Sequence, residues 1–183
     1  MLIISLIMPV SAKPDFSYYI FTAESFSELG SWYKTGSNSG SPETLILRHD
    51  SGSDSASLTF KTGSDRYWNI YIHTRDFDTT NNRSFAVGID GNEFPTTVGN
   101  HGNNGWMWEL AAKAPLLSGE HTLSLIPKRS YSRCDYILVT DDITFNPDSI
   151  ENLSEVKKII FTAMIRLYTP NTQTVRKANL LYF

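Results

Sequence analysis

Two apolar runs near the end of the chain constrain its fold more than any other feature. Residues 120–126 read EHTLSLI and residues 134–140 read CDYILVT, with a short basic and polar link between them. Both runs have the length and residue types of β-strands, and the second ends in the turn pair Asp141-Asp142. The pattern predicts that these runs form the last hairpin of an antiparallel sandwich.

The residues between 16 and 147 repeat this kind of pattern. Strands are predicted at residues 17–23, 43–49, 56–62, 67–74, 84–90, 107–110, 121–126 and 134–140. Within residues 67–74, Trp68, Ile70 and Ile72 alternate with other side chains, which places these three on one buried face. Short strands between clusters of turn residues favour an all-β sandwich over an alternating βαβ fold.

The two ends of the chain differ from this body. Residues 1–12 read MLIISLIMPVSA, an uncharged apolar run with a small-residue end, and we interpret them as a signal peptide, the alternative being a strand at residues 2–8. Residues 148–183 have apolar side chains at three- and four-residue spacing and predict a helical tail or linker. That tail is a helix packed on the sandwich, the beginning of a further domain, or the product of a misplaced gene boundary. The predicted sandwich is thus residues 13–147, and the predicted location is extracellular.

Charge and composition exclude several classes of function. The net charge is −3, which gives no general attraction to nucleic acid. The single cysteine, Cys134, lies within a predicted strand and is interpreted as a buried apolar residue. No nucleophile-elbow, zinc-protease or phosphate-loop motif occurs, and the acidic neighbours Asp141 and Asp142 are interpreted as turn caps. The sequence therefore predicts a protein that is not an enzyme.

Four segments in order carry a resemblance to a known family. They are FTAESF at residues 21–26, RSFAVGIDG at 83–91, GWMWEL with LLSGEHTLSL within 105–125, and CDYILVTDDITFNP at 134–147. Together they resemble the carbohydrate-binding modules of families 6 and 35, which are jelly-roll β-sandwiches of the galactose-binding-like type. The resemblance implies a secreted module that binds a polysaccharide or oligosaccharide without cutting it, ancillary to a glycoside hydrolase or polysaccharide lyase missing from this chain. The alternative is a structural or adhesion sandwich without a sugar site.

The resemblance also implies a set of sugar-binding residues. A sugar ring needs an aromatic platform for its C–H face and planar polar groups for its hydroxyls. By position the candidates are Trp32 or Tyr33, Trp106 or Trp108, and Arg133, with His101, Asn103 and Asn104 from the loop at residues 97–105. Trp32 is expected to be exposed. At least one of the alternating pair Trp106 and Trp108 is expected in the core. Trp106 is preferred as the binding residue because it is nearer to the loop. Arg133 is suited to the carboxylate of an acidic sugar.

A structural calcium between the first and last strands is a further implication of the resemblance. Calcium requires oxygen ligands, and the matching positions are Glu24 and Asp135. The family's other acidic position is Thr22 in this chain, and the loss of a carboxylate lowers the expected affinity. The alternative is that Glu24 and Asp135 are strand-end carboxylates that accept hydrogen bonds from the backbone.

Overall fold

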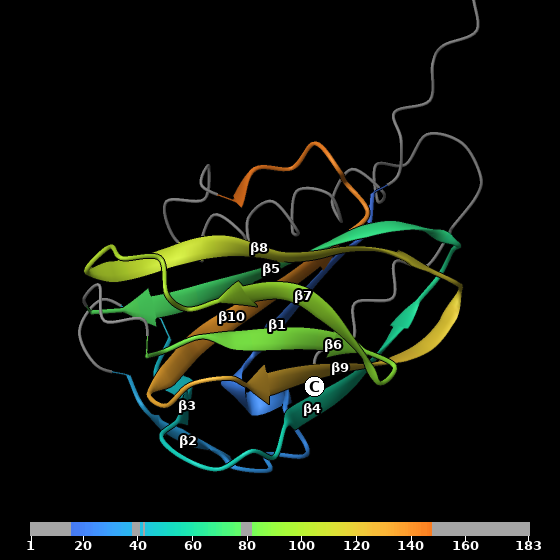
Figure 1. Cartoon of the computed structure of the whole chain (residues 1–183). Helices are drawn as coiled ribbons and strands as arrows, with labels where there is room; N and C mark the ends of the chain where they lie inside the picture. The colour runs from blue at the N-terminus through green and yellow to red at the C-terminus, as the bar shows by residue number, and fades with distance from the viewer. Residues whose placement is uncertain (1–15, 38–40, 42, 78–81, 148–183) are drawn as a thin grey trace, which may run out of the picture.

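The computed structural model describes residues 16–37, 41, 43–77 and 82–147, which form two antiparallel β-sheets packed face to face (Figure 1). The predicted signal peptide (1–12) and helical tail (148–183) lie outside the described residues. The described strands are β1 (Tyr18–Thr22), β2 (Trp32–Gly36), β3 (Leu45–His49), β4 (Ala56–Thr62), β5 (Arg66–Asp76), β6 (Phe85–Ile89), β7 (Asn92–Val98), β8 (Gly105–Leu116), β9 (Gly119–Pro127) and β10 (Ser132–Thr140), with one 3-10 turn, η1 (Ala23–Ser25). The predicted all-β sandwich is confirmed.

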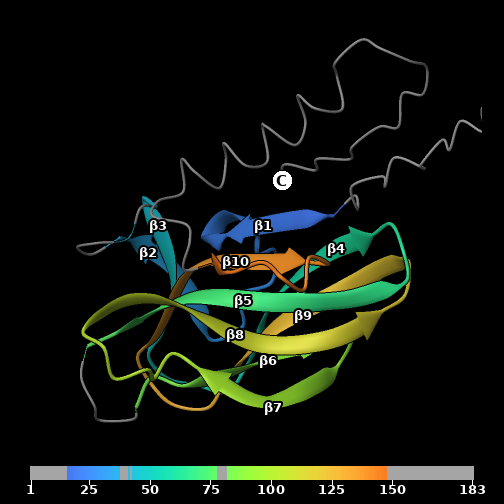
Figure 2. The same cartoon turned by 90° about the horizontal axis from the view of Figure 1, so that it is seen from above.

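The larger sheet has six strands in the order β2-β3-β10-β5-β8, with β1 also paired to β10, and the smaller has the order β4-β9-β6-β7. Strand β10 has two partners on one side. Its beginning pairs with β3, from Ser132 to Cys134, and its end pairs with β1, from Tyr136 to Thr140. Figure 2 shows β1 lying next to β10 at the border of the described molecule. This arrangement makes β10 a central strand, in keeping with its apolar sequence.

The core lies between the two sheets. The side chains of Trp68, Ile70 and Ile72 on β5 are fully buried, as their alternation predicted, and they belong to one cluster with Leu123 and Leu125 of β9. Successive side chains of a strand point to opposite faces, so the odd-numbered residues of β5 face outward from the sandwich. The outward face of β5 therefore belongs to the exterior surface of the six-stranded sheet.

The predicted hairpin of β9 and β10 is wrong, because the two strands lie in different sheets. Strand β9 pairs with β4 and β6, whereas β10 pairs with β1, β3 and β5. The link between them crosses from one sheet to the other. The amides of Lys128 and Arg129 both donate to the carbonyl of Ser84, at 3.2 and 2.9 Å, and so anchor the beginning of this crossing. The apolar runs located the strands but contained no information on their partners.

Two strands were not predicted, and a third is longer than expected. Strand β7 has the sequence NEFPTTV, which is mostly exposed and contains a proline, as an edge strand allows. The chain turns before it at Asp90 and Gly91, which both have positive φ values, 53° and 80°. Strand β2 follows Gly30, whose φ is +54° and whose added Cβ would lie 2.4 Å from the carbonyl oxygen of Ser55. The strand predicted at residues 107–110 extends over twelve residues as β8.

Candidate functional site: an aromatic and arginine-rich face

The outer face of the six-stranded sheet carries an aromatic cluster at the border of β5 and β8. In this pairing His73 is the partner of Trp108, and Arg75 is the partner of Trp106. Because Ile72 and Thr74 of β5 point into the sandwich and are fully buried, His73 and Arg75 point outward. The strand pairing alone therefore brings two indoles, an imidazole and a guanidinium onto one surface.

The imidazole of His73 contacts both indoles. Its ring centroid lies 5.3 Å from that of Trp106, at an interplanar angle of 20°, and 4.9 Å from that of Trp108, at 40°. Both indoles are half-buried, and neither belongs to the core cluster. The expectation that one of the two would lie in the core is therefore wrong. The two rings form a partly exposed platform of the kind that stacks on the apolar face of a sugar.

A register shift in β8 explains this outcome. The pairing with β5 shifts by one residue at Ile70 and Tyr71. Before the shift, the even-numbered residues Trp106 and Trp108 face outward, whereas after it Ala112 and Ala114 face the core. A bulge reverses the face that alternate residues occupy, so simple alternation along the sequence cannot assign both ends of this strand.

Buried polar contacts hold the platform in place. Nδ1 of His73 lies 2.7 Å from Oδ1 of Asp135, and Oδ2 of Asp135 accepts a hydrogen bond of 2.7 Å from the hydroxyl of Ser41. The neighbouring Tyr136 donates its hydroxyl to Glu43, and burial together with this bond raises the pKa of Tyr136 well above its ordinary value. The ring of Tyr136 in turn stacks near Trp108, with centroids 6.3 Å apart. These contacts orient the rings before any ligand arrives, which lowers the entropic cost of binding.

Tyr33 and Arg133 lie on the same outer face, farther across the sheet. Tyr33 of β2 is the partner of Arg48 on β3, and Arg48 is the partner of Arg133 on β10. The tyrosine ring is 38% exposed, so it is available to a ligand. Its hydroxyl donates to Asp50 at 2.6 Å, and Arg48 forms an ion pair with the same carboxylate at 2.7 Å. The predicted residues Tyr33, Arg133 and Trp106 thus share one surface that extends across the sheet.

The loop residues His101 and Asn103 lie at the end of this surface where β8 begins. The loop is tied to β5 because the amide of Gly102 donates to Asp76 at 2.8 Å. Within the loop, the amide of Asn103 donates to Nδ1 of His101 at 3.2 Å. Next to them, Arg75 reaches Asn104 at 3.5 Å. The predicted loop residues are therefore near the aromatic cluster.

Trp32 is placed in the core, and its expected exposure is wrong. It is 3% exposed and packs edge-on against Phe85, with ring centroids 5.2 Å apart. The reason is that Trp32 opens a strand and does not belong to a loop. In a strand it alternates with Tyr33, so only one of the two can face outward. The aromatic residue that β2 contributes to the surface is Tyr33.

The donors around the predicted calcium ligands do not fit a calcium ion. Calcium takes six to eight oxygen ligands. Both carboxylate oxygens of Asp135 are engaged by His73 and Ser41, and the side chain of Glu24 is exposed. The backbone carbonyl of Glu24 accepts a hydrogen bond from the ammonium group of Lys34. Among residues 16–37, 41, 43–77 and 82–147, no three histidine, cysteine or acidic side chains gather where they would hold a metal.

Other ionisable groups in the described part of the chain have structural contacts. Asp141 accepts from the amide of Ser17 at 2.6 Å and forms an ion pair with Arg66 at 2.7 Å, while Asp142 accepts from the hydroxyl of Tyr18 at 2.7 Å. Asp142 also accepts from the amide of Thr144 at 3.0 Å, as predicted for a turn cap, whereas the contacts of Asp141 are to the residue before β1 and to β5. Cys134 is 1% exposed, and burial raises the pKa of its thiol. Its side chain lies in the core, as expected from the sequence.

The two-sheet fold of this chain is similar to that of solved carbohydrate-binding modules. A family 35 carbohydrate-binding module from Clostridium thermocellum superimposes with a TM-score of 0.56 at 16% identity, covering 67% of this chain and 97% of that chain. The C-terminal family 6 module of a marine laminarinase from Zobellia galactanivorans gives a TM-score of 0.53 at 14% identity, covering 68% of this chain and 99% of that chain. The fold is that of carbohydrate-binding modules of families 35 and 6.

The same scaffold occurs within larger proteins. A GH26-CBM35 β-(1,4)-mannanase from Podospora anserina superimposes with a TM-score of 0.56 at 16% identity, and the match covers 71% of this chain but only 29% of the mannanase. No protein-family model matches the sequence, and the search of curated proteins gives no match. Within the described residues, no helix is both long and apolar enough to cross a membrane. These similarities establish the jelly-roll architecture.

Proposed function

We propose that this chain is a non-catalytic module that binds polysaccharide on the outer face of its six-stranded sheet. The observation that carries the proposal is the pair of half-buried indoles, Trp106 and Trp108, whose rings both contact the imidazole of His73. Aromatic faces that are rigid and partly exposed match the C–H face of a pyranose. Arg75 is the strand partner of Trp106, and Glu43 accepts a hydrogen bond from the hydroxyl of Tyr136, whose ring stacks near Trp108. Both side chains are suited to hydrogen bonds with hydroxyl groups.

A structural sandwich without a sugar site is the less favoured function. That function requires the aromatic candidates to be sealed in the core, and only Trp32 meets the condition. Trp106, Trp108 and Tyr33 all retain exposed surface on one face. The solved structures that share the fold include modules described as carbohydrate-binding, which supports the same choice.

The proposal extends to location and partners. An apolar start at residues 1–12 supports export, and the mannanase with the same scaffold supports an association with a polysaccharide-degrading enzyme. A module that holds the polymer raises the effective concentration of an attached catalytic domain at its substrate, without new contacts at the active site. The chain's own part in this proposal is binding alone.

A binding survey tests the proposal. Purified protein is titrated with soluble polysaccharides of different backbones, neutral and acidic, while its tryptophan fluorescence is recorded. We expect one or more of them to bind and to change the emission, since two of the four tryptophans lie at the site. Trp106→Ala should weaken that binding at least tenfold, in line with stacking contributions of about 1–3 kcal/mol to a binding free energy.

A matched variant supplies the control. Tyr67 lies on the outer face of β5, at the far end of that strand from His73, and is 66% exposed. Tyr67→Ala removes an exposed aromatic ring from the same sheet and should leave binding unchanged. Equal affinity of wild type, Trp106→Ala and Tyr67→Ala for every bound polymer would place the sugar elsewhere and refute the proposed site.

A further inference from the structure

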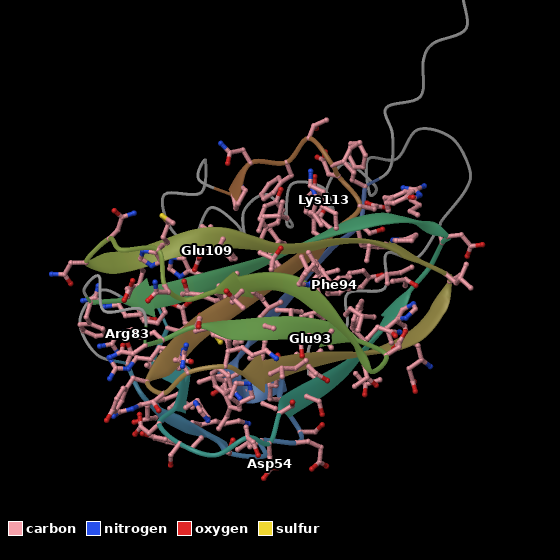
Figure 3. The ribbon with its side chains drawn as sticks, in the orientation of Figure 1. Asp54, Arg83, Glu93, Phe94, Glu109 and Lys113 are labelled. Carbon is pink, nitrogen blue, oxygen red and sulfur yellow. The ribbon has the colours of Figure 1, made fainter. Side chains whose placement is uncertain are left out.

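Four arginines converge at one end of the six-stranded sheet with too few carboxylates to neutralise them. The Cζ atoms of Arg75, Arg83 and Arg133 lie 4.2, 4.6 and 4.6 Å from the centre of the Phe77 ring. Arg48 is the strand partner of Arg133. Figure 3 shows Arg83 at the end of the sandwich where β5 ends and β8 begins. We call these four residues the arginine cluster.

Among the residues that the structure describes, two carboxylates face the arginine cluster, and both are already engaged. Asp50 forms an ion pair with Arg48 at 2.7 Å. Asp76 lies 3.4 Å from Nε of Arg83 and accepts hydrogen bonds from the amides of Phe77 and Gly102. Arg75 and Arg133 have no carboxylate within ion-pair distance in the described part of the chain. The arginine cluster thus has an excess of positive charge on a protein whose net charge is −3.

Arg133 is the least compensated member of the arginine cluster. Its Nε is sealed from solvent and has no hydrogen-bond acceptor. Partial burial and the neighbouring charges of Arg48 and Arg83 lower the pKa of its guanidinium. A half-buried cation without an acceptor costs stability, because its lost hydration is not replaced. A charge held at such a cost within a partly exposed surface indicates a ligand that supplies the missing anion.

We propose that the arginine cluster binds an oxyanion carried by the polysaccharide, a carboxylate or a sulfate ester. This inference rests on the proposed function and names its class of ligand. The planar fork of a guanidinium matches either oxyanion with two parallel hydrogen bonds. Arg75 is the strand partner of Trp106, so a sugar ring stacked on this indole carries its substituents beside the arginine cluster. The exposed ring of Tyr33 lies across Arg48 at the other side.

The phosphates of nucleic acid are the competing anion. Nucleic-acid binders spread their positive charge along a basic stripe, whereas here Asp50 and Asp76 border a cluster of four residues. Arg48 and Arg83 already form ion pairs with these two carboxylates. The geometry provides for one or two oxyanions next to a stacking platform, and not for a long run of phosphates.

Binding of three polysaccharides, measured at constant ionic strength, distinguishes a preference for an oxyanion from binding of a neutral polymer. Dextran is neutral, dextran sulfate carries sulfate esters, and polygalacturonate carries carboxylates. We expect wild-type protein to bind one charged probe at least tenfold more tightly than dextran. Arg133→Gln should abolish that preference. The control is Arg129→Gln, which removes the same charge from an exposed arginine outside the arginine cluster and should change affinity less than twofold.

Folding is checked independently, and it provides a second readout. Because Arg133 makes no hydrogen bond or ion pair with the described residues and lies among other cations, Arg133→Gln should unfold at the same temperature as wild type or at a higher one. Inorganic sulfate, compared with chloride at equal ionic strength, should raise the unfolding temperature of wild type more than that of Arg133→Gln. An arginine that merely packs on Phe77 would give equal shifts in the two proteins, which would overturn the anion site.

The remaining outcomes distinguish this inference from the proposed function. Wild-type affinities that are equal for the three probes, or an equal loss in Arg133→Gln and Arg129→Gln, would overturn the inference while polysaccharide binding stands. Single-stranded DNA that binds as tightly as the preferred probe would also overturn it. If sulfate stabilises wild type selectively but no polysaccharide binds, the anion site stands and the proposed function fails.

Discussion

The imidazole of His73 and the carboxylate of Asp135 join the aromatic platform to the centre of the six-stranded sheet, with Nδ1 and Oδ1 2.7 Å apart. The carboxylate is fully buried, and its other oxygen accepts a hydrogen bond from Ser41. Asp135 lies where the pairing of β10 with β5 shifts its register. The irregularity places a carboxylate within reach of His73, whose ring contacts both indoles. One buried acid therefore orients the ring on which the platform depends.

Removal of this acid should destabilise the fold. Asp135→Ala leaves His73 and Ser41 without their acceptor, and we expect a loss of about 2–4 kcal/mol in the free energy of unfolding. Urea denaturation followed by tryptophan fluorescence measures it. Glu93→Gln is the control, because the ion pair of Glu93 with Lys128 is largely exposed and should contribute under about 1 kcal/mol. A loss no larger in Asp135→Ala than in this control would contradict the prediction.

Lys34 should stabilise the turn after β1. Its ammonium group donates to the backbone carbonyls of Glu24 and Phe26, at 3.3 and 3.1 Å. Lys34→Met keeps most of the apolar stem but leaves both carbonyls without this donor, and we expect a loss of about 1–3 kcal/mol in the free energy of unfolding. Lys113→Met on the exposed side of β8 is the matched control and should change it by less than about 0.5 kcal/mol.

The calcium prediction is tested with the same protein. Because the donors around Glu24 and Asp135 do not fit calcium, we expect EDTA to leave the unfolding temperature of wild type unchanged. Thermal unfolding followed by circular dichroism, with EDTA and then with excess calcium, measures it. A decrease in the unfolding temperature with EDTA that excess calcium reverses would show that the protein binds a structural metal ion, and would contradict the prediction.

The contact between His121 and Asp90 should make stability depend on pH. Burial disfavours the charged imidazole, but hydrogen bonds to Asp90 and to the carbonyl of Leu117 outweigh it and raise the pKa of His121. The stabilisation is therefore full below the unfolded-state pKa of about 6.5 and is lost as pH rises through the higher folded-state value. For Asp90, burial is likewise outweighed by these bonds, its pKa is lowered, and its contribution is lost as pH falls below about 3.8.

Urea midpoints across this range measure the effect. We expect the wild-type midpoint to decrease from pH 6 to pH 8, and His121→Gln to remove most of that decrease. The control is His101→Gln, which changes an imidazole in the loop before β8 and should keep the wild-type slope. An unchanged slope in His121→Gln would assign the pH dependence to another group.

The sequence predicted the positions of most strands because each combines an apolar run with turn residues. The strand at residues 56–62 has the predicted bounds, and Trp68, Ile70 and Ile72 are buried as their alternation indicated. Strand β7 escaped prediction because NEFPTTV is an edge strand that buries almost nothing. Pairing of β9 with β10 was wrong because the choice of partner depends on how the two sheets pack, which short-range patterns do not contain.

The candidate site was only partly predictable for the same reason. Family resemblance placed Tyr33, Trp106 and Arg133 in three separate segments, and the strand register brings them onto one face. His73, Arg48, Arg75 and Phe77 were missed as site residues. Three of them had a signal, since outward positions of β5 and β3 follow from the alternation of those strands. That Arg75 of β5 and Arg133 of β10 both reach the ring of Phe77 depends on the register of β10 with β5, which only the folded structure shows.

The neighbours Trp32 and Tyr33 should give opposite phenotypes, because they point to opposite faces of β2. Trp32 is buried against Phe85, so Trp32→Ala should lower the free energy of unfolding by about 3–5 kcal/mol. Tyr33 is exposed and donates only to Asp50, so Tyr33→Ala should cost less than about 1 kcal/mol and should weaken polysaccharide binding severalfold. Urea denaturation and fluorescence titration of both variants measure the two effects. A stable Trp32→Ala protein that has lost binding would mean that the indole faces outward, and the orientation of β2 would have to be reversed.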